Sequence, residues 1–133
     1  MRNLIISEIK SCQKFFDQNF EIFDCKLNDN KISSSLKNGV YVLYTRNFIM
    51  YVGRGSVAHR LKTHIEKIKG VFIHAKDTKG FKKLRSTKKL ELNEVSVVYF
   101  GCNQPHISCA FEGSLIYKLM PLANDDTYKI VLK

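Results

Sequence analysis

No apolar stretch of this 133-residue chain approaches the length of about 18 residues that a membrane-spanning helix requires. The N-terminal residues 1–8 also hold too short an apolar run for a secretory signal peptide. We therefore expect a cytoplasmic protein with no membrane partner. With 44% hydrophobic and 26% charged residues, the chain has the composition of a globular protein, most simply a single domain.

Closely spaced cysteine pairs of the Cys-x-x-Cys kind are absent as well. The four cysteines stand far apart, at positions 12, 25, 102 and 109, so we expect reduced thiols rather than a disulfide framework. Cys102, His106 and Cys109 lie close enough in sequence to leave open a zinc-supported interaction domain. A zinc site would need a fourth ligand and a tighter ligand spacing, which makes ordinary thiols the simpler interpretation.

Acidic residues are scarce in one part of the chain, from Arg54 to Lys89. This segment holds twelve basic and two acidic residues, so it alone carries the net charge of +10 that the whole chain has. Such a block attracts polyanions, the phosphate backbone of a nucleic acid first among them, although a solvated surface is the alternative that charge alone leaves open. The candidate nucleic-acid-binding residues are Arg54, Lys62, Lys67, Lys69, Lys76, Lys79, Lys82, Lys83 and Arg85.

Hydrophobic periodicity predicts an α+β domain. We expect a β-hairpin from 40–45 and 48–52 and a buried strand at 95–100, which together form a small three-stranded sheet, mixed or antiparallel, flanked by helices. Residues 128–132 are a candidate for a further edge strand. The expected helices span residues 3–18, 57–69, 81–90 and 106–119. Residues 1–38 would form an N-terminal helical extension packed on a core of residues 39–133, with a basic insertion at about 70–90.

Groups suited to phosphodiester chemistry recur around this hairpin. Tyr41 and Tyr51 stand ten residues apart, one on each expected strand. Arg60 and His64 follow at helical i, i+4 spacing, and Glu112 lies in an otherwise uncharged helical run. Each group also has an ordinary interpretation, as a core aromatic residue or as part of an exposed helix face. No single one of them is diagnostic.

Taken together, these residues resemble the GIY-YIG nuclease family over residues 39–124. The strings GVY at 39–41 and YVG at 51–53 match its two motifs, with valine in place of isoleucine. Arg60 matches the family's catalytic arginine, His64 the histidine of its restriction enzymes, and Glu112 its metal-binding glutamate. The stretch EGSLIYKLMPLAN at 112–124 is similar to the Glu…Leu-Ile-Lys-x-Leu-x-Pro-x-Tyr-Asn stretch of its repair excinuclease and ends at Asn124.

The resemblance implies a DNA endonuclease that uses one Mg²⁺, for which Mn²⁺ can substitute, held by Glu112. Tyr41 would be the general base, with a pKa lowered by the metal and by nearby cations, and His64 would hydrogen-bond it. Arg60 would bind a phosphate oxygen, Tyr51 would orient the water or the arginine, and Asn124 would brace the site.

Two alternatives accompany this interpretation. His74, in the basic insertion, could take the role of His64, although it stands outside the i, i+4 register with Arg60. The same fold could also serve as a nucleic-acid-binding module that cuts nothing. A compact nuclease, for example a small restriction enzyme that acts as a monomer or homodimer on DNA, fits a chain of this length.

Overall fold

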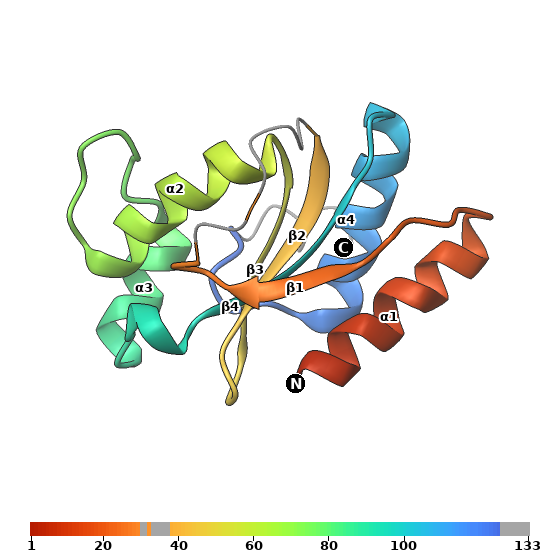
Figure 1. Cartoon of the computed structure of the whole chain (residues 1–133). Helices are drawn as coiled ribbons and strands as arrows, with labels where there is room; N and C mark the ends of the chain where they lie inside the picture. Colours follow the sequence, from red (N-terminus) through yellow and green to blue (C-terminus); the bar gives the residue numbers. More distant parts are fainter. Residues whose placement is uncertain (30–31, 33–37, 126–133) are drawn as a thin grey trace.

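A four-stranded antiparallel sheet lies at the centre of the fold (Figure 1). The computed structural model describes residues 1–29, 32 and 38–125. In spatial order the strands run β1-β4-β2-β3, which places β2 and β4 inside the sheet and β1 and β3 at its edges. Their bounds are Phe23–Lys26 for β1, Gly39–Tyr44 for β2, Ile49–Gly55 for β3 and Ser96–Gly101 for β4.

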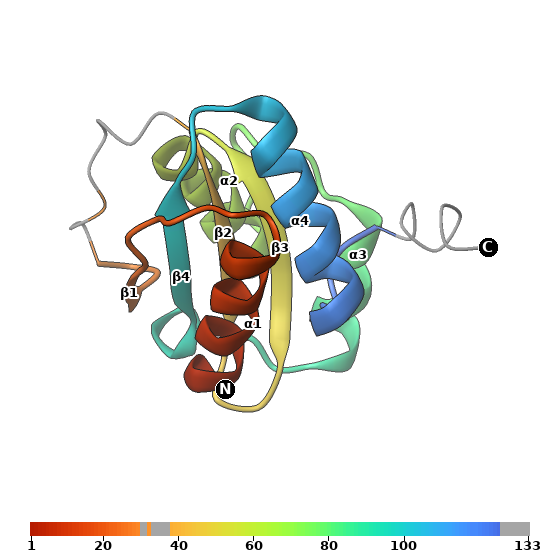
Figure 2. The same cartoon turned by 90° about the vertical axis from the view of Figure 1, so that its right-hand side faces the viewer.

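Four α-helices cover the two faces of this sheet, in the part of the chain that is described. They are α1 (Arg2–Phe15), α2 (Val57–Lys69), α3 (Lys79–Thr87) and α4 (Pro105–Leu119), and a short 3₁₀ turn spans Leu92–Glu94. Helices α1 and α4 lie on one face, and α2 and α3 lie on the other (Figures 1 and 2). None of the helices in the described ranges is long and apolar enough to cross a membrane.

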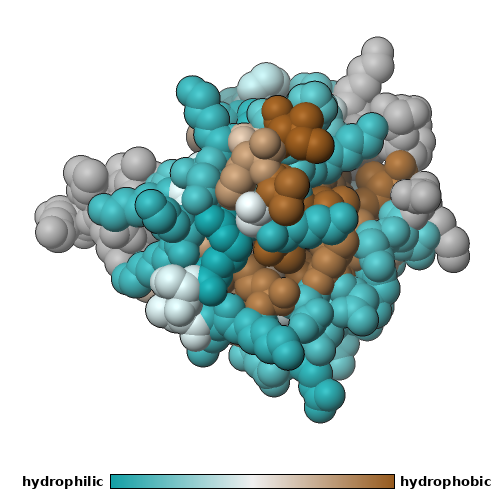
Figure 3. Space-filling model, turned by 90° about the vertical axis from the view of Figure 1, so that its left-hand side faces the viewer, coloured by the Kyte–Doolittle hydropathy of each residue, from teal (hydrophilic) through white to brown (hydrophobic). Residues whose placement is uncertain are grey.

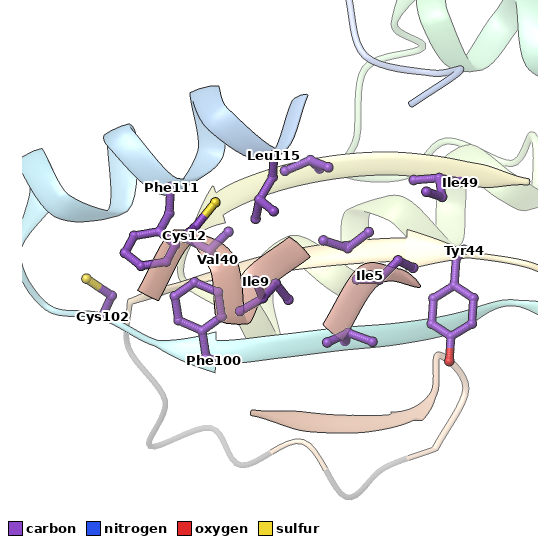
Figure 4. Close-up of a cluster of buried hydrophobic side chains, with 13 residues drawn as sticks. Ile5, Ile9, Cys12, Val40, Tyr44, Ile49, Phe100, Cys102, Phe111 and Leu115 are labelled. Atoms are coloured by element: carbon purple, nitrogen blue, oxygen red, sulfur yellow. The ribbon is translucent and has the colours of Figure 1, made fainter. Parts of the chain in front are cut away.

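Strand β2 is buried along its whole length because helices cover both of its faces. Side chains of successive strand residues point to opposite faces. Val40 and Val42 therefore pack against α1 and α4, whereas Tyr41 and Leu43 pack against α2 and α3. The hydrophobic cluster under α1 and α4 is drawn in Figure 4. This alternation sends Tyr41 toward the helix that carries Arg60 and His64.

The first helix is part of that cluster. Ile5 and Ile9 of α1 are fully buried in this cluster, Ile9 near Phe100 and Ile5 near Tyr44 (Figure 4). Burying an isoleucine side chain stabilises a fold by about 1.5–3 kcal/mol. Phe20 stacks on Phe100 at a ring-centroid separation of 5.3 Å. The segment before the hairpin thus contributes directly to the hydrophobic core.

The predicted sheet was one strand short. Strand β1 was not anticipated because its four residues, FDCK, are mostly exposed and show no hydrophobic alternation. The sheet is antiparallel throughout rather than mixed. The predicted hairpin, the strand near 95–100 and the four helices are confirmed with shifts of a few residues at their ends. The candidate strand at 128–132 falls outside the described residues.

Candidate active site

A cavity of about 310 Å³ opens beside the C-terminal half of the edge strand β3. Strand alternation directs Tyr51 and Arg54 to opposite faces of the sheet, so helices from both faces contribute side chains around this edge. The lining residues are Tyr41, Tyr51, Arg54, Gly55, Arg60, Thr63, His64, Lys67 and Glu112. Two larger hollows, of about 870 and 680 Å³, lie against α1 and against α3, away from this group.

Tyr41 and His64 are joined at the buried end of this cavity. The Tyr41 hydroxyl lies 2.7 Å from His64 Nε2, and the two residues are 1% and 2% exposed. Gly53, which pairs with Tyr41 across the hairpin, makes room for this contact. A Cβ at Gly53 would come within 2.4 Å of the Tyr41 hydroxyl oxygen, so a side chain there would displace the phenol.

Burial opposes ionisation of both partners. It lowers the pKa of His64 to about 3, an effect to which the charges of Lys67 and Arg60 add. Burial also raises the pKa of Tyr41 above its ordinary value, and the Tyr51 and Glu112 charges reinforce the shift while Arg60 opposes it. The sequence-based expectation of a lowered Tyr41 pKa is therefore not met by the protein residues alone. At neutral pH the pair consists of a phenol and a neutral imidazole.

The neutral imidazole should make stability fall in acid. The folded-state pKa of His64, about 3, lies below its ordinary value of 6.5, so the unfolded chain takes up the proton first. The corresponding stabilisation is complete above pH 6.5 and is lost as the pH falls toward 3. From about pH 7.5 to pH 5, wild-type protein should lose up to about 2 kcal/mol more unfolding free energy than His64→Gln. Urea unfolding at several pH values measures this difference. The exposed His59 of the same helix offers a control, and equal pH dependence of wild type and His64→Gln would contradict a neutral His64.

Aromatic rings enclose the imidazole of His64. The ring of Tyr51 lies 4.5 Å from it, centroid to centroid, and the ring of Phe81 lies 5.3 Å from it. Phe81 is fully buried, and its ring also carries the Lys67 ammonium at 5.5 Å. His64 Nδ1 is buried with no hydrogen-bond partner in the described structure. Helix α3 therefore contributes an apolar side chain that shields the His64 imidazole from solvent.

Glu112 brings a carboxylate to the opposite side of the cavity. Its Oε1 lies 3.3 Å from Arg54 Nε, and both side chains are partly exposed. Burial raises the pKa of Glu112 above its ordinary value, while the charges of Arg54 and Arg60 pull it down. The carboxylate is thus partly desolvated and held by cations.

Arg60 and Lys67 place two further positive charges at the cavity. Arg60 is exposed on α2 and packs beside Gly55, where a Cβ would lie 3.2 Å from its Nε. Gly55 also adopts a φ of +125°, which a residue with a side chain rarely adopts. Partial burial lowers the pKa of Lys67. Arg60, His64 and Lys67 form an i, i+4, i+7 stripe, which is one face of a helix.

Asn124 lies beside the cavity rather than in it. Its side chain accepts a hydrogen bond from the Val52 amide at 2.9 Å and donates one to the Val52 carbonyl at 2.8 Å. The amides of Leu122 and Ala123 donate to carbonyls of Ile49 and Met50, so this segment covers the outer edge of β3 as far as Val52. The cavity begins just beyond the covered stretch.

The predicted DNA-binding cations occupy three kinds of place. Arg54 and Lys67 line the cavity. Arg85 is engaged within the fold, where it binds both carboxylate oxygens of Asp77 and the Lys67 carbonyl. The others are exposed on α2, on α3 or in the loop between them: Lys62, Lys69, Lys76, Lys79, Lys82 and Lys83. His74, the alternative to His64, is exposed in that loop and is absent from the residues that line the cavity.

Three residues at or behind the site have a sequence signal that the predicted set of catalytic residues does not include. Phe81 and Leu84 are the buried residues of α3, and their i, i+3 spacing in an otherwise basic stretch indicates an inward face. Lys67 shares the helical stripe of Arg60 and His64, although the sequence-based prediction includes it only among the nucleic-acid-binding cations. Both signals depend on side-chain register within a single helix.

The donor groups present suit a hard cation better than zinc. Glu112 is the one carboxylate among the described residues that line the cavity, and Mg²⁺ is commonly held by one or two carboxylates together with waters and substrate phosphate. In the described part of the chain, no group of three or more His, Cys, Asp or Glu is placed to hold a metal ion. Cys102, His106 and Cys109 lie in that part, so the geometry gives no support to the zinc alternative.

No family model matches the chain, and neither a curated protein nor a solved structure matches it significantly.

Proposed function

We propose that this protein is a Mg²⁺-dependent DNA endonuclease of the GIY-YIG type. The observation that carries the proposal is the convergence in one cavity of a buried tyrosine–histidine pair, three cations and one carboxylate. Cleavage of a phosphodiester needs an activated oxygen nucleophile and positive charge at the phosphate oxygens. The net charge of +10 in residues 54–89 supplies the long-range attraction for a nucleic acid.

Glu112 is the residue that would hold the metal ion. When bound there, Mg²⁺ supplies positive charge to the phosphate and lowers the pKa of its water. Arg54, which pairs with Glu112 at 3.3 Å, would then be free to face a phosphate oxygen. Its contact with Glu112 would be replaced by a charge-assisted contact with the phosphate.

Tyr41 and His64 form the proton-accepting part of the site. His64 is neutral at physiological pH, so its Nε2 can hydrogen-bond the phenol in either tautomer. The proposal assigns the general-base role to Tyr41: its own hydroxyl proton passes to His64 Nε2 as the phenol oxygen takes the proton of the attacking water. Tyr51 and Phe81 pack on the imidazole and hold its orientation.

Arg60 and Lys67 stabilise the phosphate as charge develops on its oxygens. The guanidinium of Arg60 can donate two parallel hydrogen bonds to phosphate, which favours one orientation of the scissile group. Lys67 stands one helical turn beyond His64 and contributes a point charge to the same face.

Cleavage of supercoiled plasmid in Mg²⁺ and in EDTA tests this proposal. Wild-type protein should nick or linearise the plasmid in Mg²⁺ and leave it intact in EDTA. The Glu112→Gln protein, purified in the same way, controls for contaminating nuclease. Discrete fragments would favour a restriction-type enzyme over a non-specific one. DNA binding without cleavage in either metal, Mg²⁺ or Mn²⁺, would contradict the nuclease and favour the binding module.

A further inference from the structure

The connection between α2 and α3 exposes three consecutive apolar side chains. Val71, Phe72 and Ile73 are 60%, 37% and 77% exposed, and we call them the apolar tip. The connection projects from the left-hand end of the molecule in Figure 1. On the face that carries α2 and α3, hydrophobic side chains gather among hydrophilic ones (Figure 3). Exposed apolar groups framed by polar ones commonly mark interaction sites.

The backbone of the apolar tip is held in place. Gly70 ends α2 in the left-handed conformation, at a φ of +73°, and its amide and that of Val71 donate to the Glu66 carbonyl. The Glu66 carboxylate accepts hydrogen bonds from the amides of Ile73 and His74. These bonds lower the pKa of Glu66, so the carboxylate stays charged. These hydrogen bonds therefore fix the backbone conformation of the apolar tip.

Arg85 fixes the base of the same projection. Its Nη2 lies 2.7 Å from each carboxylate oxygen of Asp77, and its Nη1 donates to the Lys67 carbonyl at 2.8 Å. The guanidinium also stacks over the Phe72 ring, 5.2 Å from its centroid. Arg85 thus links the end of α2, the tip and α3 into one unit.

Positive charge surrounds the tip on both sides along the chain. Lys69 precedes it by two residues, Lys76 follows it by three, and both are exposed. Nucleic acid is the partner that combines a polyanionic backbone with apolar faces inside a stack of bases. Proteins that bend or open nucleic acid use apolar side chains as wedges between base steps in this way.

We propose that the apolar tip inserts between stacked bases of the nucleic acid that the basic segment binds. The inference rests on the proposed function for its partner, and it adds a contact outside the cavity. Gly70 follows Arg60 by ten positions, which is about 15 Å along a helix. With α2 aligned along the duplex, at about 3.4 Å per base step, insertion would fall on the order of four steps from the phosphate that Arg60 would contact.

Binding of a fully paired duplex and of a duplex with one abasic site tests whether the apolar tip inserts between bases. Insertion costs least where a base is already unstacked, so wild-type protein in EDTA should bind a duplex with one abasic site about tenfold more tightly than the fully paired duplex. The double variant Val71→Ser/Ile73→Ser should lose this preference and keep its affinity for the paired duplex within about threefold. Fluorescence anisotropy of labelled duplexes measures both affinities. Both replaced side chains are more than half exposed, so the variant should fold.

A matched control comes from α1, at the opposite end of the molecule in Figure 1. Leu4 and Phe15 are also exposed, at 51% and 83%, and Leu4→Ser/Phe15→Ser should retain the wild-type preference. If the tip variant binds both duplexes like wild type, the wedge is wrong while the DNA-binding function stands. If the wild type binds neither duplex, the proposed function fails and takes the wedge with it.

An anionic membrane surface is the competing partner for such a tip. Vesicles of phosphatidylserine and phosphatidylcholine distinguish the two. The proposed base insertion would be wrong, and a lipid contact favoured, if the tip variant lost binding to the vesicles but bound both duplexes like wild type. Base insertion is supported if wild-type protein does not bind the vesicles and the tip variant loses the preference for the abasic duplex.

Discussion

Glu112→Gln should lower Mg²⁺-dependent DNA cleavage by about 1,000-fold or more. A metal ion contributes several kcal/mol of charge stabilisation, and each 1.36 kcal/mol corresponds to a factor of ten in rate. Among the described residues Glu112 is the one carboxylate that lines the cavity, so none of the other lining residues described can take over the ion. DNA affinity should hold or rise, because the change removes a negative charge near the phosphate. Time courses of plasmid cleavage and anisotropy measure the two effects.

The raised pKa of Glu112 adds a pH signature to this prediction. Burial pushes the pKa of the carboxyl above its ordinary 4.5, so protons compete with the metal at a higher pH than for an exposed glutamate. The wild-type cleavage rate should fall as the pH drops through the raised pKa of Glu112. Added Mg²⁺ should shift this fall in rate to lower pH. Glu8→Gln, on α1, provides a control that leaves the rate unchanged. A Glu112→Gln protein that cuts at the wild-type rate would remove the metal assignment.

The arrangement that makes these tests possible was largely predictable from local patterns. Helix α2 runs from Val57 to Lys69, as its periodicity and the flanking glycines predict. The contact between Tyr41 and His64 was expected from the family resemblance rather than from hydrophobic spacing, and their side chains meet at 2.7 Å. Strand β1 gave no such signal, since its side chains are mostly exposed and its place depends on pairing with β4.

Properties that depend on tertiary burial were harder to anticipate. The resemblance implies that a metal ion and nearby cations lower the pKa of Tyr41, but among the protein residues burial outweighs the cations and raises that pKa. The ion pair of Arg54 with Glu112 joins residues 58 positions apart, and no local pattern announces it. Phe81 becomes a wall of the site only because α3 folds back over α2. The sequence therefore predicts some of the groups that meet, whereas the other contacts and the direction of the pKa shifts depend on how the complete fold packs and buries these side chains.

Tyr41→Phe should reduce cleavage by a factor of about 10²–10⁴, the usual contribution of a general base. The substitution keeps the buried ring and removes only the hydroxyl that meets His64 Nε2. It also leaves both nitrogens of the imidazole without a partner, which should lower stability by about 1–3 kcal/mol. Thermal unfolding checks that the variant is folded at the assay temperature. DNA binding should match wild type within a few-fold, so the loss should appear in the cleavage step.

Tyr44→Phe supplies the matched control, because Tyr44 lies on the same strand but faces α1 and α4. It should cut at the wild-type rate. Tyr51→Phe tests whether Tyr51, rather than Tyr41, is the general base. Tyr51 is the more exposed of the two tyrosines. It would be the base if its hydroxyl proved essential for cleavage and the hydroxyl of Tyr41 proved dispensable. If Tyr41 and His64 act as one unit, the double variant Tyr41→Phe/His64→Gln should cut no more slowly than Tyr41→Phe alone. Additive losses would instead mean that His64 acts on the phosphate or on water independently of the phenol.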